Sequence, residues 1–178
     1  MKIRYLSLVP AFFLCIETII AQDSPATYKA PKYEMEWMQP SLHPDRITLN
    51  YGADPKTTAS VTWRTNTDVK VAYAEIAKST GSPKFWRTGK RFTAETSLLD
   101  GSKVIYAGIV ANYHYVTFTD LEPNTVYCYR VGDDSHWSEW IQFRTASETD
   151  DKFSFLYVGD AQDLILEMWS RVLREGFR

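Results

Sequence analysis

The chain has 178 residues, of which 44% are hydrophobic and 15% aromatic, and its formal net charge is −2. This length allows one domain with additional segments, and the absence of a basic excess argues against a nucleic-acid-binding protein. The apolar fraction is sufficient for a packed core, and the many aromatic residues favour strands over a helical bundle.

Residues 1–21 have the pattern of a secretory signal peptide. Lys2 and Arg4 give a positive start, and Leu6–Ile20 is a short apolar stretch. Ala21 offers a small residue for cleavage. The rival interpretation is a membrane anchor, but the apolar stretch is short for a span. We therefore expect a secreted or periplasmic protein that has no membrane contact once the signal is cleaved.

Residues 22–45 contain four prolines and no clear period, which predicts an extended leader. After signal cleavage Cys128 would be the only cysteine, so no internal disulfide is expected. Cys128 alternates with Tyr127 and Tyr129, which we expect to face the core. Its thiol should therefore lie on the other side of the sheet, as a packing or surface group rather than a nucleophile.

Strand-like segments with alternating side chains fill residues 46–145. We expect seven strands, the number in an immunoglobulin-like sandwich: Arg46–Tyr51, Ala59–Arg64, Val69–Ala77, Phe85–Thr93, Ala111–Phe118, Val126–Val131 and Trp140–Arg144. The core is expected to be stabilised chiefly by five large side chains: Trp63, Tyr73, Leu121, Tyr127 and Tyr129.

The segment TFTDLEPNTVYCYRVGD, residues 117–133, predicts a corner of the sandwich. Pro123 and Asn124 supply a turn, and the Tyr127 hydroxyl is placed to fold back onto upstream backbone, as in a tyrosine corner. The spacing L-x-P-x-T-x-Y resembles a fibronectin type III domain. This resemblance predicts the fold and not the function, because such sandwiches carry many unrelated activities.

Histidine and tryptophan side chains offer few functional signals within the sandwich. His114 has no histidine near it in sequence, which favours a structural role, and neither His43 nor His136 lies in a metal-binding motif. Three tryptophans, if exposed, could stack on sugars: Trp86, Trp137 and Trp140. We favour packing in loops or against another domain, because large aromatic side chains are usually buried.

The character of the sequence changes after the polar linker at residues 146–152. Phe153–Val158 is a continuous apolar run, which predicts a strand buried on both faces of an α/β layer. Residues 164–173 have helical periodicity, with Asp163 as a candidate cap. Asp160 would then lie at the carboxyl edge of the sheet, where a carboxylate can bind a metal ion. The alternative role for Asp160 is to cap the turn before the helix.

The order of these parts resembles the start of a purple acid phosphatase of the calcineurin-like metallophosphoesterase superfamily. The resemblance covers roughly Leu42–Arg178 and is carried by YHYVTFTDLEPNTVYCYRVGD and FSFLYVGDAQ. It implies a secreted enzyme that hydrolyses phosphate monoesters at a binuclear centre of iron with zinc, manganese or a second iron. On this resemblance Asp160 matches the first metal-ligand aspartate. The family's D-x-G is replaced here by Asp160-Ala161-Gln162.

The resemblance also implies that further ligands follow the first helix, namely a bridging aspartate, an asparagine and several histidines. All three histidines of this chain precede Asp160. The predicted fold class is therefore mainly β: a fibronectin-III-like sandwich at 46–145, followed at 153–178 by the first β-α unit of a truncated metallophosphoesterase domain. We expect the chain alone to bind no binuclear centre and to be inactive, with no catalytic residue of its own.

Two other functions stay open at this point. One is a non-catalytic adhesion or carbohydrate-binding module, and the other is a different metallophosphoesterase, such as a phosphodiesterase. The expected partner of a complete enzyme is a phosphate-ester substrate. The apolar C-terminal unit is also expected to offer a surface for self-association, because its strand lacks neighbours.

Overall fold

The computed structural model describes residues 38–101, 108–149, 152–159, 161 and 165–176. All the strands described below lie in the unit that comprises Gln39–Arg178. The predicted signal peptide and the leader as far as residue 37 lie outside the described residues. No helix in the described part of the chain is long and apolar enough to cross a membrane.

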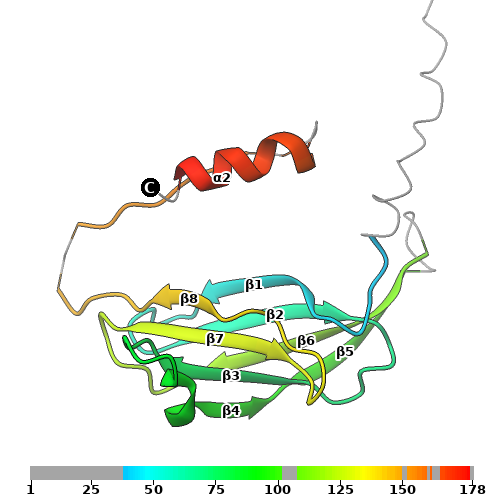
Figure 1. Cartoon of the computed structure of the whole chain (residues 1–178), viewed down its shortest axis with the longest axis horizontal. Coiled ribbons are helices and arrows are strands. Elements are labelled where there is room, and N and C mark those ends of the chain that lie inside the picture. Colours follow the sequence, from blue (N-terminus) through cyan, green and yellow to red (C-terminus); the bar gives the residue numbers. More distant parts are fainter. Residues whose placement is uncertain (1–37, 102–107, 150–151, 160, 162–164, 177–178) are drawn as a thin grey trace, which may run out of the picture. The chain divides into compact units, whose positions relative to one another are not determined.

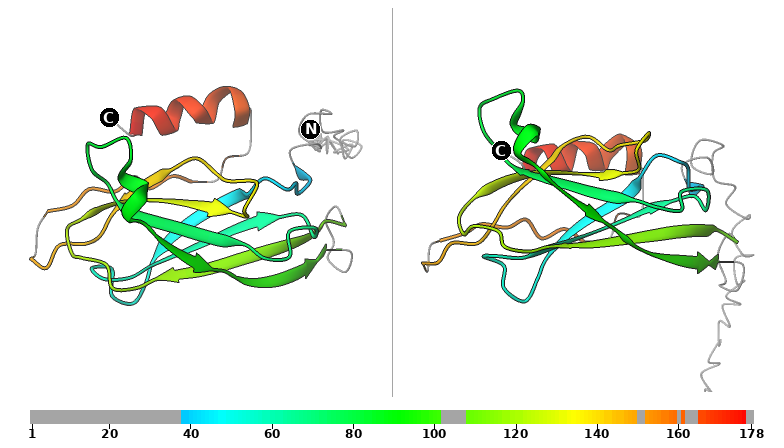
Figure 2. Two further views of the ribbon diagram at one scale, coloured as in Figure 1. Left: turned by 60° about the horizontal axis from the view of Figure 1, so that its bottom comes forward. Right: turned by 90° about the horizontal axis from the view of Figure 1, so that it is seen from below.

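In the described residues, eight antiparallel strands form two four-stranded sheets that face each other (Figure 1). One sheet has the order β1-β2-β6-β5, with strands Asp45–Tyr51, Ala59–Thr65, Val110–Phe118 and Glu95–Asp100. The other has the order β4-β3-β7-β8, with strands Lys90–Thr93, Tyr73–Lys78, Val126–Gly132 and Ile141–Arg144. Figure 2 shows the two layers from other sides. The predicted fibronectin-III-like sandwich is confirmed.

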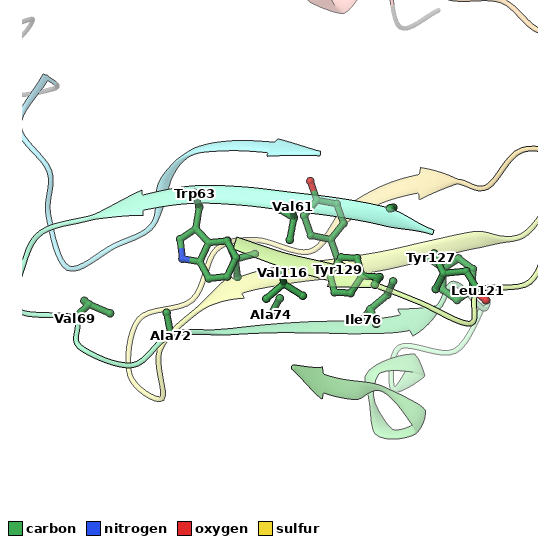
Figure 3. Packing of buried hydrophobic residues seen from close by; sticks show 13 residues of the cluster. Val61, Trp63, Val69, Ala72, Ala74, Ile76, Val116, Leu121, Tyr127 and Tyr129 are labelled. Atoms are coloured by element: carbon green, nitrogen blue, oxygen red, sulfur yellow. The ribbon is translucent and has the colours of Figure 1, made fainter. Parts of the chain in front are cut away.

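Alternating side chains from both sheets fill the space between them (Figure 3). Val61 and Trp63 of β2 are fully buried, and they face Ala74 and Ile76 of β3 across the core. Tyr129 of β7 packs in the same cluster. The alternation of β2 places Thr62 on the opposite, outer face. Burial of large apolar side chains is the main favourable term in such a fold, at about 1.5–3 kcal/mol for each side chain.

The predicted tyrosine corner is present. The backbone N–H of Glu122 donates to the Tyr127 hydroxyl at 2.9 Å, and Asn124 adopts a positive φ of 46° in the turn. Thr145, which the sequence analysis did not single out, also holds this corner. Its buried hydroxyl donates to the Glu122 carbonyl at 2.6 Å and accepts from the Thr125 N–H at 2.9 Å.

Two predicted strands need correction. The third begins at Tyr73 rather than Val69, because the Asn112 side-chain amide, and not a neighbouring strand, donates to the Val69 carbonyl at 2.9 Å. The fourth is divided into a 3₁₀ turn, η1 (Phe85–Thr88), and β4, which begins after Gly89. The structure also contains β5 (Glu95–Asp100), which was not predicted and pairs with β6 at the sheet edge.

Tyr73 is not a core residue, contrary to prediction. Ala74 and Ile76 are the inward positions of β3, so Tyr73 and Glu75 lie on the outer face of the sheet. The other four side chains expected in the core are buried: Trp63, Leu121, Tyr127 and Tyr129.

The predicted buried strand at Phe153–Val158 is wrong. Residues 152–159 form no regular secondary structure, and Phe153 and Tyr157 are 83% and 87% exposed. A strand of this kind requires partner strands on both sides and layers on both faces, and the described residues supply neither. The helix that follows comprises a π-type turn, η3 (Ile165–Trp169), and α2 (Ser170–Gly176). The β-α unit expected here is therefore not found, and the described end of the chain has only this short helix.

Candidate functional site

Asp160, the predicted metal ligand, lies outside the described residues, as does Asp163, the predicted helix cap. The residues that lead to Asp160 are described, and they are exposed and irregular. Within the described ranges, no group of three or more His, Cys, Asp or Glu side chains is arranged to hold a metal ion. These residues therefore do not fit a binuclear metal centre.

His114 has a structural environment. It is fully buried, with Nε2 2.7 Å from the Thr65 hydroxyl and Nδ1 2.9 Å from the Thr96 hydroxyl. Its ring lies 5.3 Å from the Trp63 ring. Burial lowers the pKa of His114 to about 4, so the ring is neutral near pH 7. A neutral imidazole with both nitrogens bonded to hydroxyls is a satisfied core group.

The outer face of the β4-β3-β7-β8 sheet carries alternating rings and guanidinium groups. The Arg130 guanidinium carbon lies 4.2 Å from the Trp137 ring centroid and 4.9 Å from that of Trp140. The Arg91 guanidinium carbon lies 4.9 Å from the Tyr73 ring centroid and 5.3 Å from the Trp137 ring centroid. We call this series the Arg-Trp ladder, comprising Tyr73, Arg91, Trp137, Arg130 and Trp140.

Glu75 binds both arginines of the ladder. Its Oε1 accepts from Arg91 Nε at 2.9 Å, and its Oε2 accepts from Arg130 Nε at 2.8 Å. The Glu75 hydrogen bond raises the pKa of Arg91, and Asp134 adds a second ion pair at 2.8 Å. The charges of the ladder are thus compensated internally, which leaves no unpaired cation in it for an anionic ligand.

The tryptophan predictions can now be assigned residue by residue. Trp137 and Trp140 have arginines against their rings, and Phe85 contacts Trp140 edge-on at a centroid distance of 5.1 Å. The packing interpretation therefore holds for these two. Trp86, in η1, is 49% exposed and contacts only the Arg87 guanidinium among the ring contacts found in the described residues.

Cys128 pairs with Ala77 and Gln142 across the sheet and is buried. Its position between Tyr127 and Tyr129 places it on the outer face, as expected. Gly89 lies over this region, since a Cβ added there would lie 3.4 Å from the Ala77 Cβ. A buried thiol in such surroundings is a packing group and not a nucleophile.

A pocket of about 350 Å³ opens beside the tyrosine corner, between the end of β3 and the β6–β7 turn. Lys78 and Glu122 form an ion pair at its rim, and both side chains are at least half exposed. Asp120, also in its lining, has a positive φ of 57°. The lining provides one compensated pair and no convergent set of buried polar groups, which a specific ligand site normally has.

His43 and His136, which lie in no metal motif, come together at one end of the sandwich. Their ring centroids are 4.9 Å apart, and His136 also contacts the Asp133 carboxylate. The sequence does not reveal this contact, because it joins two segments that are far apart in the chain, one before β1 and one between β7 and β8.

Several solved structures match part of this chain. They include a computationally redesigned β-sandwich protein (22% identity, 60% of this chain and 96% of that chain, TM-score 0.37). The fn3 domain of human contactin 1 is 14% identical over 65% of this chain and 86% of that chain, with a TM-score of 0.42. Astrotactin-2, a vertebrate-specific perforin-like membrane protein, is 17% identical over 61% of this chain and 23% of that chain, with a TM-score of 0.43.

No curated protein matches the sequence. A family model described as "Purple acid Phosphatase, N-terminal domain" matches residues 44–145. This range covers every strand of the sandwich, since β1 begins at Asp45 and β8 ends at Arg144. The chain therefore belongs to the purple acid phosphatase N-terminal domain family.

Proposed function

We propose that this chain is the accessory sandwich of a secreted, metal-dependent acid phosphatase that hydrolyses phosphate monoesters. The observation that carries the proposal is the family match over residues 44–145. The segment FSFLYVGDAQ, which follows the sandwich, resembles the first metal motif of the same family and places Asp160 as a candidate ligand.

The sandwich itself is assigned no catalytic role in this proposal. Its buried histidine is bonded to two threonine hydroxyls, and its surface arginines are paired with Glu75. Because the described residues contain no metal-binding group of three or more side chains, the metal-dependent step belongs to residues outside them. A two-metal hydrolase requires ligands that converge from several loops and a positioned water.

The test is an assay of the purified 178-residue chain with p-nitrophenyl phosphate at acid pH, with iron, zinc or manganese added. We expect no turnover. The transcript should also be sequenced past the codon for Arg178. The proposal predicts Gly-Asp, Gly-Asn-His and Gly-His-x-His elements there, and a protein extended through them should be active. Replacement of Asp160 by Asn should then sharply reduce its activity. Metal-dependent turnover by the short chain, abolished by Asp160→Asn, would contradict the division of roles.

A second candidate is a non-catalytic binding module. It is favoured by one observation: the sandwich is complete within residues 45–144, with both sheets formed and its core filled. A stop codon directly after Arg178, with a folded and stable protein, would support this candidate. Continuation of the reading frame into the phosphatase elements would reject it.

A further inference from the structure

Two of the chain's three histidines lie in contact on the surface of the sandwich. His43 lies in the segment before β1, and His136 lies in the turn between β7 and β8. Their ring centroids are 4.9 Å apart, with an angle of 77° between the ring planes. Both side chains are accessible to solvent, so this contact is not imposed by burial in the core.

Backbone hydrogen bonds fix the segment that carries His43. The N–H of Asn66, just after β2, donates to the Ser41 carbonyl at 2.8 Å. The Ser41 hydroxyl oxygen accepts from the His43 N–H at 3.2 Å and donates to the His43 carbonyl at the same distance. The backbone of His43 is therefore held near the end of β2, and the contact between the His43 and His136 rings places the His43 side chain beside the β7–β8 turn.

The Asp133 carboxylate orients His136. Its oxygens lie 3.2 and 3.3 Å from His136 Nδ1, and its Oδ1 also accepts the backbone N–H groups of Ser135 at 2.7 Å and His136 at 2.5 Å. These hydrogen bonds fix the Asp133 carboxylate against His136 Nδ1. A carboxylate in this position favours the tautomer with hydrogen on Nδ1, which leaves the Nε2 lone pair available.

A carboxylate bonded to one nitrogen of a histidine is the usual support of a metal-ligating imidazole. The spacing of the rings fits as well. Two imidazoles whose nitrogens each lie about 2.0–2.1 Å from one tetrahedral ion have ring centroids roughly 5–5.5 Å apart. The observed 4.9 Å is close to this value, so the spacing of the two rings suits one ion shared between them.

We propose that His43 and His136 form a two-histidine site for a late first-row divalent transition metal, with Asp133 as the supporting carboxylate. Water completes the coordination, since the described residues offer no third ligand there. Imidazole nitrogen selects Cu²⁺, Ni²⁺ and Zn²⁺ over Mg²⁺ and Ca²⁺, which prefer oxygen ligands. Cu²⁺ should bind most tightly, following the general order of divalent metal affinities. The bound ion would join the segment before β1 to the β7–β8 turn.

The experiment is an isothermal calorimetric titration of tag-free protein with Cu²⁺, Zn²⁺ and Mg²⁺, each in turn, near neutral pH. We expect one Cu²⁺ per chain, weaker binding of Zn²⁺ and no binding of Mg²⁺. His43→Ala and His136→Ala should each weaken Cu²⁺ binding at least about tenfold, as should Asp133→Asn, within the range found for supporting residues.

Asp134→Ala is the matched control, because this carboxylate lies in the same turn but has no bond to His136. The affinity of the Asp134→Ala variant for Cu²⁺ should equal that of the unchanged protein. The paramagnetic resonance spectrum of the Cu²⁺ complex should show two nitrogen ligands, reduced to one in either histidine variant. Since both rings are on the surface, the variants should keep the thermal midpoint of the metal-free protein. Full-strength Cu²⁺ binding by the double histidine variant, or its absence in the unchanged protein, would overturn the proposal.

Discussion

The backbone N–H of Glu122 donates a hydrogen bond of 2.9 Å to the Tyr127 hydroxyl, so that a side chain of β7 closes the turn that precedes its own strand. The Tyr127 ring is buried and lies 5.9 Å from the Phe143 ring of β8 in a stacked arrangement. Tyr127 therefore contributes in two separable ways, through its hydroxyl and through its ring.

Two substitutions of Tyr127 should separate these contributions. Tyr127→Phe keeps the ring and removes the hydrogen bond, which should lower the free energy of unfolding by about 1 kcal/mol. Tyr127→Ala also leaves a cavity in the core and should lower it by about 3–5 kcal/mol. Urea denaturation monitored by tryptophan fluorescence measures both values. Small and equal losses would mean that neither the corner nor the ring contact has the assigned role.

The stability of the sandwich should decrease with acidification through His114. Its pKa is about 4 in the folded protein and about 6.5 in an unfolded chain. Below pH 6.5 the unfolded chain gains a proton that the folded protein does not, so unfolding becomes more favourable as the pH decreases. This contribution is complete above the unfolded pKa and is lost between pH 6.5 and 4.

The expected loss from this one group between pH 7 and pH 4.5 is roughly 2 kcal/mol, by proton linkage. His114→Gln offers the comparison, because glutamine can still bond to Thr65 and Thr96 but does not titrate. Urea denaturation of both proteins at the two pH values should show the larger decrease in the protein with histidine. Identical pH dependence in the two proteins would show that His114 does not carry this effect.

The strands with strict alternation could be predicted from the sequence, and those without it could not. In β2 and β7 the large apolar residues recur at every second position, so Trp63, Tyr127 and Tyr129 were assigned to the core correctly. In β5 most side chains are exposed because the strand lies at a sheet edge. Its inward position at Thr96 is polar, since it bonds to His114. Such a strand carries no apolar period to detect.

The contacts among surface side chains, such as those of Glu75, depend on the register in which neighbouring strands pair. This register cannot be read from the sequence. Glu75 lies opposite Arg91 of β4 and Arg130 of β7 only because β3 pairs with both strands in this alignment. The same limitation applies to His43 and His136, which meet through the arrangement of separate turns. The apolar run at Phe153–Val158 misled for a different reason: its composition suits a buried strand, but the described residues provide no strand to pair with it.

Glu75 should be more important for stability than its position on the surface suggests. It is mostly buried and accepts hydrogen bonds from two arginines. Glu75→Gln keeps the shape and removes the charge, which should lower the free energy of unfolding by about 1.5–2 kcal/mol, in the range for hydrogen bonds to charged groups. Chemical denaturation near neutral pH gives the value.

Glu122→Gln is the matched control, because it is the same substitution in an exposed ion pair with Lys78. Exposed pairs contribute about 0–1 kcal/mol, so this variant should lose less than Glu75→Gln. The difference should persist in salt, which screens the exposed pair more strongly than the partly buried one. Equal losses in the two variants would show that the Arg-Trp ladder does not depend on its central carboxylate.

The C-terminal segment should open far more readily than the sandwich. Residues 152–159 have exposed side chains and no regular secondary structure, and no residue of α2 is buried. The strands, in contrast, are hydrogen-bonded into two sheets around a filled core. Amides without such protection exchange through local opening, which costs little free energy, whereas core strands exchange only when most of the structure unfolds.

Hydrogen-deuterium exchange followed by mass spectrometry should therefore show peptides from residues 152–176 exchanging well before those from β2, β6 and β7. The edge strand β5 serves as an internal comparison, because it is paired on one side only, and its peptides should exchange at an intermediate rate. The measurement should be repeated at several protein concentrations. Protection of residues 152–176 that rises with concentration would reveal self-association through the apolar run Phe153–Val158. Protection equal to that of β2 at every concentration would mean that this segment is folded in a way that the structure does not describe.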